Sequence, residues 1–457
     1  MKKSILAVVV LLLAVATLPI VGNSYMKQTI DEGLQKLKSQ GLHTKIDTST
    51  SSYLNSSRHF EFLLKDSKNF VKYFNKYSGK QMLTYVNTML DGVMVGADVT
   101  YSNLPFAKAL EIEVYPLSLS SKMKNALQES DEKFAEYIQK FLQSKGILYH
   151  VDYNLLNSDF KGYIKDIDEK HKLKGGAEVA LFLHKATFRG NGPLIAPNSL
   201  KTKLKELHLD AKKTISLELK NFSSLSNFES ENAYVSSTNI EDIQISLKGM
   251  KQGLNASIKK FRASASSKEG GDIINLNSKT SLESLNIDSN ILQVKLKKFN
   301  FDVAFNNLDK KLIENLQLLS EKSDFLSEKL YQQKWQNLLM NLFSRGLEVN
   351  VADFSVKDIF TKSRGDLKGF DMKGKVIVKE DPLLKSKIKI SPLLAISDVD
   401  VLTNIRISKK IMDNLIREYG KFTPLMKYAK EDGDDLLFNM KFIDSKAILN
   451  GKTFYQK

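Results

Sequence analysis

The chain opens with one long apolar run, which is the strongest hydropathy feature of the sequence. Lys2 and Lys3 precede it, and the positions from Ile5 to Gly22 carry no charge. As a helix these positions would span about 27 Å, close to the ~30 Å hydrocarbon core of a bilayer. We therefore predict a transmembrane signal-anchor over residues 1–25. The residues expected to face lipid are Ile5, Leu11, Leu12, Leu13, Leu18 and Ile20.

A cleaved signal peptide is the alternative interpretation of this run. Residues 14–16 fit an A-x-A cleavage site that ends at Ala16, after a short apolar stretch. We favour the anchor, because the sequence from Thr17 to Val21 stays apolar beyond that site. The lysine pair then stays in the cytoplasm by the positive-inside rule. This predicts a single-pass protein of the bacterial inner membrane, with the bulk of the chain in the periplasm.

Residues 26–146 alternate between helical and β-type patterns, which predicts a juxtamembrane helix, a hairpin and a helical subdomain. The clearest amphipathic stripe lies in the last segment, where Met123, Leu127 and Phe134 begin one apolar face. The expected elements are a helix over 26–40, a hairpin over 43–65 with its turn at 54–57, a helix over 66–91, strands over 92–119 and a helix over 120–146.

Residues 147–457 show repeated alternation of apolar and polar positions, separated by short polar breaks. Strict alternation buries one face of a strand and solvates the other, as in an antiparallel sheet. The expected strands include residues 215–222, 243–250, 254–263, 291–305, 347–356, 370–381, 383–390 and 436–449. The fold class predicted is α+β and predominantly β: a long curved antiparallel sheet with accessory helices and the N-terminal transmembrane helix. A single-faced sheet with few helices must curl, pack on a second sheet or line a groove.

Two helical insertions interrupt this region and resemble each other weakly. Residues 310–316 read KKLIENL and residues 409–415 read KKIMDNL, each after a strand-like run. The first insertion continues into an apolar helix over 321–345. Core packing accounts for that apolar stripe, and a membrane-surface or partner helix is the alternative. The residues that would then contact lipid or a partner are Phe325, Leu330, Trp335, Leu339 and Phe343.

The charge balance argues against a nucleic-acid partner. The net charge of +16 arises from 61 lysines and only seven arginines against 52 acidic residues. Nucleic-acid binders favour Arg for bidentate contacts and cluster their charge on one face, whereas these lysines are dispersed. Lysine on solvent positions of strands also limits edge-to-edge aggregation. Attraction to anionic headgroups beside the anchor is the alternative role.

No residue pattern predicts a catalytic, cofactor or metal site. Cysteine is absent, which removes thiol catalysis, disulfides and iron–sulfur clusters. The six histidines form no HExxH pair, and the sequence contains no GxSxG, Walker or GxGxxG motif. We interpret KDIDEKH, which ends at His171, and EDGDD over 431–435 as turns. We therefore expect a non-enzymatic protein without a cofactor.

Several of these elements together resemble the YdgA-like family of bacterial envelope proteins, a domain family of unknown function. Gly22 and Tyr25 follow the apolar run, and SYLNSSRHFEFLL over 52–64 is similar to the first hairpin of that family. The C-terminal elements that carry the resemblance are WQNLLMNLFSRGLEVNVADFSV (335–356), RGDLKGFDMKGKVIV (364–378), DVDVLTNIRISKKIMDNLI (398–416) and AILNGK (447–452). The resemblance implies an inner-membrane-anchored periplasmic β protein and no catalytic residue.

The expected function is therefore that of an envelope protein whose apolar sheet face binds lipid or another hydrophobic ligand. A structural or assembly scaffold, with a second copy or another envelope protein as its partner, is the alternative. The sheet patterning motivates the first hypothesis, because the strands outnumber the helices that cover them. In the second, an exposed sheet edge or the apolar helix at 312–343 would dock the partner.

Overall fold

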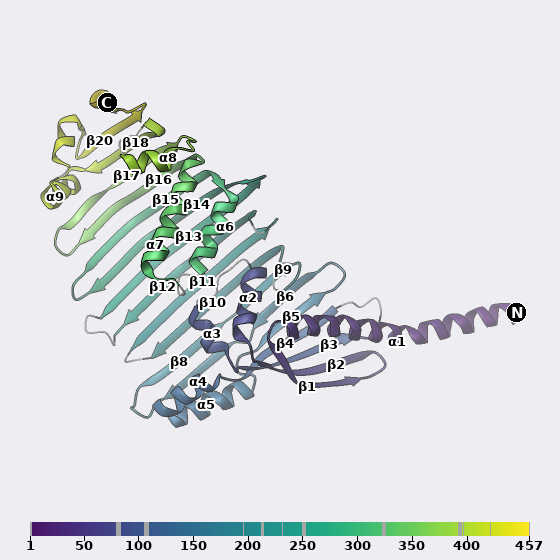
Figure 1. Ribbon diagram of the computed structural model, residues 1–457. Helices are drawn as coiled ribbons and strands as arrows, with labels where there is room; N and C mark the ends of the chain where they lie inside the picture. Colours follow the sequence, from purple (N-terminus) through teal and green to yellow (C-terminus); the bar gives the residue numbers. More distant parts are fainter. Residues whose placement is uncertain are drawn as a thin grey trace. The chain divides into compact units, whose positions relative to one another are not determined.

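The computed structural model describes residues 2–78, 84–104, 109–194, 196–211, 214–230, 232–248, 253–321, 326–391, 395, 397–420 and 422–456. The chain divides into two compact units, Met1–Leu225 and Ser226–Lys457. Each unit is built mainly from antiparallel strands with several helices (Figure 1). The predicted α+β, predominantly β fold class is confirmed at this level. β11 (Ile215–Phe228) crosses the boundary between the two units.

The first unit contains five helices and ten strands before β11 among its described residues. They are α1 (Lys2–Ser39), β1 (Leu42–Ser51), β2 (Asn55–Leu64), α2 (Ser67–Ser78), α3 (Thr84–Leu90), β3 (Met94–Ser102), β4 (Ala109–Ser118), α4 (Ser121–Ser130), α5 (Glu132–Gln143), β5 (Tyr149–Asn154), β6 (Asp159–Ile164), β7 (Ile167–Lys172), β8 (Glu178–His184), β9 (Ala186–Asn191) and β10 (Ser199–Ala211).

Antiparallel pairing runs in the order β1, β2, β3, β4, β5, β6 and β9. β10 pairs with β9 along its first half and with β8 along its second half, and β7 pairs with β8. Residues 159–172 and 178–191 thus form one long hairpin with a break in the middle. At the break Lys185 has a left-handed φ of 53°, and its backbone N–H donates to Asp166 Oδ1 at 2.7 Å. A left-handed residue of this kind bends the strand locally.

The second half of α1 packs on the first three strands and forms the main core of this unit. Met26 and Leu34 on the helix are buried against Phe60, Phe62 and other apolar side chains of β1 to β3. Ile30, Leu34 and Leu37 share the helical stripe that the sequence indicates, so the helix predicted over 26–40 is confirmed, while its position beside a membrane stays a prediction. Arg58 adds a polar link, because it contacts Asp31 on α1 at 2.6 Å.

The predicted helix over 120–146 is wrong in one respect, because the structure has two helices there, α4 and α5. Asp131 separates them in an extended conformation, and its backbone N–H closes α4 on Leu127. Its carboxylate then accepts from Phe134 N at the start of α5 and from Lys174 N at 2.7 Å. These hydrogen bonds to the side chain compete with a continuous helix.

The second unit contains eleven strands after β11 and five helices among its described residues. They are β12 (Tyr234–Leu247), β13 (Leu254–Gly270), β14 (Ile273–Ser289), β15 (Gln293–Asp309), α6 (Lys310–Glu321), α7 (Glu328–Ser344), β16 (Leu347–Thr361), β17 (Gly365–Val378), α8 (Leu384–Ile390), β18 (Val399–Ser408), α9 (Lys409–Tyr419), the 3₁₀ helix η3 (Thr423–Tyr428), β19 (Lys430–Asp432), β20 (Asp435–Ile443), β21 (Lys446–Leu449) and β22 (Lys452–Gln456).

β12 to β18 form an antiparallel meander in chain order, and β20 pairs with β18. The other edge of β20 pairs with β19 and then with β21, which carries β22. The strand predicted over 383–390 is wrong, because Leu384–Ile390 form the short helix α8. The segment predicted as a strand over 436–449 forms two strands, β20 and β21, which pair with each other. In α8, Lys387 is held by two carboxylates. Its ammonium contacts Asp381 at 2.7 Å and Asp398 at 2.8 Å, a pair of carboxylates that the local alternation does not reveal.

The resemblance between KKLIENL and KKIMDNL corresponds to two helices that start in the same way. Each helix follows its strand directly, and the last strand residue accepts a hydrogen bond from the backbone three residues later. Asp309 accepts from Leu312 N at 2.9 Å, and Ser408 accepts from Ile411 N at 3.3 Å. Such caps satisfy backbone N–H groups that have no partner within the helix. The prediction of two related strand–helix units is confirmed.

The equivalence extends to the neighbouring hairpin turns. Lys310 N donates to the carbonyl oxygen of Asp272, and Lys409 N donates to that of Asp434, both at 2.9 Å. The lysine ammonium groups also pair with a glutamate three residues before each aspartate, namely Glu269 and Glu431. Each strand–helix unit therefore joins its strand, at the point where the helix begins, to the turn of an adjacent hairpin. The turn predicted at 431–435 is observed.

In the meander, the alternation of apolar and polar positions shifts by one residue along a line that crosses neighbouring strands. Lys259 and Lys260 are both exposed in β13, as are Lys297 and Lys298 in β15, and the apolar positions shift by one residue there. Lys260 and Lys298 have left-handed φ values of 49° and 51°. Strand pairing continues in register across this line. A left-handed residue re-aims the next side chain, which lets apolar positions on both sides share one face.

The left-handed backbone at Lys298 predicts an unusual response to glycine. A left-handed conformation costs an L-residue about 1–2 kcal/mol, whereas glycine tolerates it. We expect Lys298→Gly to leave the free energy of unfolding unchanged or raise it by up to about 1 kcal/mol. Lys297→Gly is the matched control and should lower it by about 0.5–1 kcal/mol, since Lys297 is not among the left-handed residues. Urea unfolding of the two variants checks this, and equal losses would contradict it.

Candidate functional site

Two rows of apolar side chains cross neighbouring strands of the second unit on one face, the first over six strands from Leu282 to Leu436 and the second over five. The first row pairs Phe299 with Val356, Val356 with Phe370, and Phe370 with Ile407. The second row, one pleat further along the strands, contains Phe301, Phe354, Met372, Ile405 and Phe438. Directly opposed residues of paired strands lie on the same face. The rows therefore form a continuous apolar surface, which we call the aromatic face.

Edge-to-face contacts hold the four phenylalanines of this face together. The ring centroid of Phe354 lies 5.0 Å from that of Phe370, 5.6 Å from that of Phe301 and 6.2 Å from that of Phe299. Val356 lies between these rings and is buried, while the four rings themselves stay half-buried. Aromatic pairs of this geometry contribute about 0.5–1.5 kcal/mol each beyond simple burial. The face is thus ordered by its own side chains.

Helices cover this face only at two places. α6 and the end of α7 pack on Ile274, Leu308 and Leu347 at one end of the strands. α9 and η3 pack on Ile407 and Leu436 at the other side. No other described helix joins either cluster. Phe370 packs against the cluster of α9 and η3, whereas Phe299, Phe301 and Phe354 belong to neither cluster.

The exposed area of the chain is consistent with an uncovered sheet. The chain exposes 27872 Å². Two separate compact units of half its mass would together expose only about 21,000 Å². The strands contribute to this excess, because many of their side chains are half-buried or exposed on both faces. The groove hypothesis required an apolar face that the chain's own helices do not bury, and it stays a prediction.

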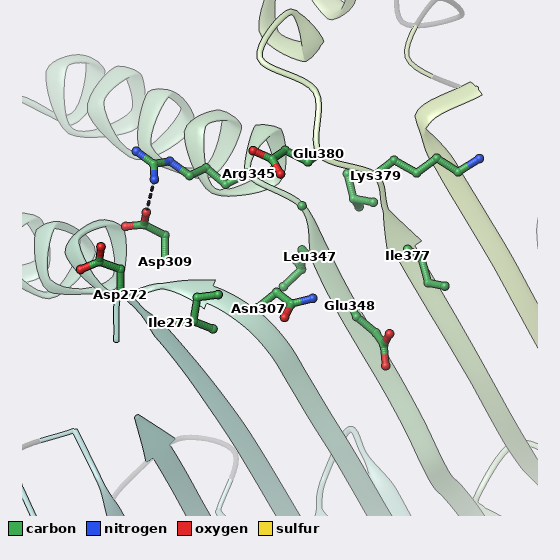
Figure 2. A pocket seen from close by; sticks show the side chains of 12 residues that line it. Asp272, Ile273, Asn307, Asp309, Arg345, Leu347, Glu348, Ile377, Lys379 and Glu380 are labelled. Carbon is green, nitrogen blue, oxygen red and sulfur yellow. Dashed lines mark ion pairs between the residues drawn. The ribbon is translucent and has the colours of Figure 1, made fainter. Parts of the chain in front are cut away.

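A cavity of about 510 Å³ lies at the strand ends beside this face, below the end of α7 (Figure 2). Its charged side chains mostly pair with groups of the chain itself. Arg345 contacts Asp309 at 2.8 Å, and Glu348 contacts Lys375 at 2.8 Å. Lys379 contacts two aspartates outside the cavity, at 3.1 and 3.2 Å. The described residues that line the cavity include no His, Ser, Thr or Tyr, so among them it offers no hydroxyl nucleophile and no imidazole base.

Helix α7 places the predicted partner residues in two different surroundings. Its last turn packs into the core through Leu342, with Phe343 half-buried beside it. Leu330 and Trp335 are exposed, and Trp335 stacks on Tyr331. Leu339 is half-buried. The predicted core packing therefore applies to the end of the helix. Phe325 lies outside the described residues.

The predicted anchor residues all lie within the span of α1, which includes Pro19. A search of the described residues finds no helix with the length and hydropathy of a membrane-spanning segment. Among the anchor residues only Ile20 has a described side chain, and it is 66% exposed. The side chains of Ile5, Leu11, Leu12, Leu13 and Leu18 lie outside the described residues. The signal-anchor stays a prediction.

The first unit contains an ionisable network that the sequence did not predict. It is centred on Asp98 of β3, whose carboxylate is shared by three partners. Tyr115 Oη donates to it at 2.9 Å, Lys145 Nζ lies at 2.7 Å and His59 Nδ1 at 2.7 Å. Lys145 also contacts Glu113 at 2.8 Å and lies over the Tyr115 ring. These residues come from three strands and a loop, so no local sequence motif could reveal them.

The network shifts the pKa values of its members in the directions that pairing predicts. Burial opposes ionisation of Asp98, but hydrogen bonds from Lys145, His59 and Tyr115 hold its pKa below the usual value. Burial and the hydrogen bond to Asp98 raise the pKa of Tyr115 to about 12. Lys145 is buried in part, yet its two carboxylate partners raise its pKa. All these shifts favour a static ion-pair network, whereas an acid–base catalyst needs a pKa near neutrality.

Among the described residues, no group of histidine and carboxylate side chains could hold a metal ion. KDIDEKH was predicted as a turn, and this is wrong, because most of it lies in β7. His171 instead stacks on Tyr137 of α5, with ring centroids 4.4 Å apart. His150 stacks on Tyr163 at 4.7 Å. Aromatic packing thus accounts for both rings.

The Asp98 network predicts a specific loss of acid stability. A depressed pKa in the folded state stabilises the fold above the unfolded-state value of 3.8, and this stabilisation disappears as pH falls through the folded-state pKa. Asp98→Asn should therefore lower the free energy of unfolding at pH 7 by about 1–3 kcal/mol. The difference from the unmodified chain should shrink below pH 4. Urea unfolding at pH 7 and pH 3 measures both values.

Glu111→Gln is the control for this experiment, since Glu111 is exposed and lies 3.9 Å from His150. It should change the free energy of unfolding by less than about 1 kcal/mol at either pH. A pH-independent loss in Asp98→Asn would contradict the assignment.

Comparison with protein-family models, with curated proteins and with solved structures gives no match for this chain. The resemblance to YdgA-like envelope proteins therefore stays a prediction from the sequence. The functional conclusions below depend on the geometry of the two units and on the patterning of the chain.

Proposed function

We propose that this chain is a non-enzymatic, membrane-anchored envelope protein whose aromatic face binds the acyl chain of a lipid. The observation that carries the proposal is the continuous apolar surface of β14 to β18 and β20, whose Phe299, Phe301 and Phe354 belong to neither of the two clusters that helices cover. Monomeric soluble proteins rarely leave contiguous apolar patches of this kind without a binding role. The N-terminal apolar run supports a membrane as the source of the ligand.

The chemistry of the face fits an extended hydrocarbon chain. It offers aromatic rings, valine, isoleucine and methionine, and its rows contain no charged side chain between Phe299 and Ile407. A row over six strands extends about 24 Å at ~4.8 Å between strands. The charged groups of the neighbouring cavity are mostly paired with each other. Affinity would therefore come from apolar burial, which depends little on the identity of the headgroup.

Photo-crosslinking of the full chain in its native membrane tests this proposal. With p-benzoylphenylalanine in place of Phe354, we expect a covalent lipid adduct that mass spectrometry identifies. The Phe301→Asp change, or the milder Phe301→Gln, should reduce the adduct, because a polar group in the second row raises the cost of burying a hydrocarbon chain.

Asn300→Asp is the matched control for the crosslinking experiment. It brings the same charge one residue away, on the opposite face, where Asn300 donates to Ser355 Oγ at 3.3 Å. The adduct should persist in this variant. Absence of any lipid adduct in the unmodified background, with the protein folded, would refute the proposal.

A partner-binding scaffold is the second candidate, and the exposure of α7 favours it. Trp335 is the only tryptophan of the chain, so its fluorescence reports the surroundings of this helix alone. In the purified full chain we expect acrylamide to quench Trp335 readily, because the side chain is 38% exposed. Addition of the partner, or formation of a dimer at high protein concentration, should protect it. Leu330→Ser should abolish that protection without changing the quenching of the free chain.

A further inference from the structure

The hairpin loops of the first unit gather at one end of its sheet. Antiparallel pairing in the order β1, β2, β3, β4, β5, β6, β9 and β10 places the β1–β2, β3–β4, β5–β6 and β9–β10 connections at the same end. Neighbouring connections are about 10 Å apart, since each lies two strands from the next. The loops therefore form one row along the sheet edge.

Each of these four loops exposes a leucine. The residues and their exposed fractions are Leu54 at 49%, Leu104 at 40%, Leu156 at 65% and Leu194 at 41%. Tyr53 is exposed beside Leu54. Single exposed leucines are common on protein surfaces, but one on every loop of the same end is a patterned apolar rim.

Two asparagines, the buried Asn103 and the half-buried Asn191, hold the loops in pairs. Asn103 is 2% exposed, and its Nδ2 donates to the carbonyl oxygen of Ser52 at 2.7 Å, which ties the β3–β4 loop to the β1–β2 loop. Its backbone N–H also donates to Leu54 O at 2.7 Å. Asn191 acts in the same way, because its Nδ2 donates to Asn157 O at 2.8 Å. These hydrogen bonds occupy backbone carbonyl groups of the loops, while the leucine side chains stay exposed.

Helix α1 leaves the sheet at this same end. Asn23 Nδ2 donates to Ser51 Oγ at 3.1 Å, and Tyr101 Oη donates to Asn23 Oδ1 at 3.1 Å, which fixes residue 23 beside the β1–β2 loop. The packed part of α1 runs from there toward Leu42 at the opposite end. Figure 1 shows α1 continuing beyond the β1–β2 turn. The C-terminal end of the apolar run, at residue 22, therefore lies at the same end of the sheet as the apolar rim.

We propose that this rim is a membrane-contact surface, seated in the interfacial region of the same bilayer that α1 enters. The inference rests on the proposed anchoring of α1 and adds an orientation: the strands of the first unit stand on the membrane with their hairpin tips down. The bilayer is the occupant that the geometry favours, because the helix that leads to the apolar run emerges within this row. Leucine tips in the interface remove apolar surface from water without exposing unsatisfied backbone groups.

The absence of cysteine makes the test direct, because a single introduced cysteine is the only site of labelling. The full chain is reconstituted into phosphatidylcholine and phosphatidylglycerol vesicles with an environment-sensitive fluorophore at one of four positions: Leu54→Cys, Leu104→Cys, Leu156→Cys or Leu194→Cys. We expect blue-shifted emission and loss of intensity with doxyl-labelled lipids for all four. Met89→Cys is the matched control, since Met89 is an exposed apolar residue near the opposite end, and its emission should stay that of water.

The outcomes separate this inference from the anchoring proposal. If the unlabelled chain does not float with vesicles, anchoring fails. If the chain floats but the four loop labels match the Met89 label, the membrane-contact surface is refuted while anchoring stands. Asn103→Ala gives a second check. It removes the side-chain hydrogen bonds from Asn103 to the carbonyl oxygens of Ser52 and Tyr53 and leaves the backbone hydrogen bond to Leu54 O. The β1–β2 loop is then held less firmly, so the blue shift at Leu54 should decrease while the shift at Leu156 stays unchanged.

Discussion

The second unit depends on one constraint: an antiparallel sheet with an apolar face and too few helices to cover it. Water makes exposed apolar surface costly, so such a face must be shielded by the chain, ordered by its own side chains, or bound by another molecule. All three solutions have a place here. α6, α7 and α9 shield the ends, and the rings around Phe354 pack on each other. Binding is the solution we propose for the remaining surface.

Keeping the apolar positions on one face over strands of up to 17 residues requires a correction along the way. The left-handed lysines at 260 and 298 supply it, since strand pairing stays in register while the alternation shifts by one position. Lysine suits this line because its long side chain reaches water from either face. Lys260 also pairs with Glu283 across the strands at 2.6 Å. The left-handed conformation of these two lysines carries a modest backbone strain, and it keeps the apolar positions on one face.

In both units, polar side chains mainly link separate segments of the chain through hydrogen bonds and ion pairs. In the first unit Asp98 ties three strands to the segment after α5, and Asn103 and Asn191 tie hairpin loops in pairs. In the second unit Asp309 caps α6 and holds Arg345. Groups used in this way have satisfied hydrogen bonds and ion pairs, which is the arrangement that stabilises a fold. The linked elements leave apolar surfaces that can bind another molecule. Both proposals concern such surfaces.

The sequence by itself determined the features whose physics is local. Alternation predicted the antiparallel strands, a helical stripe predicted the packed part of α1, and the repeated KKLIENL and KKIMDNL segments predicted two related strand–helix units. These features depend on periods of two and 3.6 residues and on caps within one turn, so a single segment contains the information.

Only the tertiary structure decided what depends on residues far apart in the chain. Leu384–Ile390 form a helix in which Lys387 is held by Asp381 and Asp398, and Asp131, which bonds to Lys174, divides a predicted helix. The Asp98 network and the aromatic face combine strands whose register no local pattern specifies. The apolar rim likewise exists only because pairing order brings four loops to the end of the sheet where α1 departs.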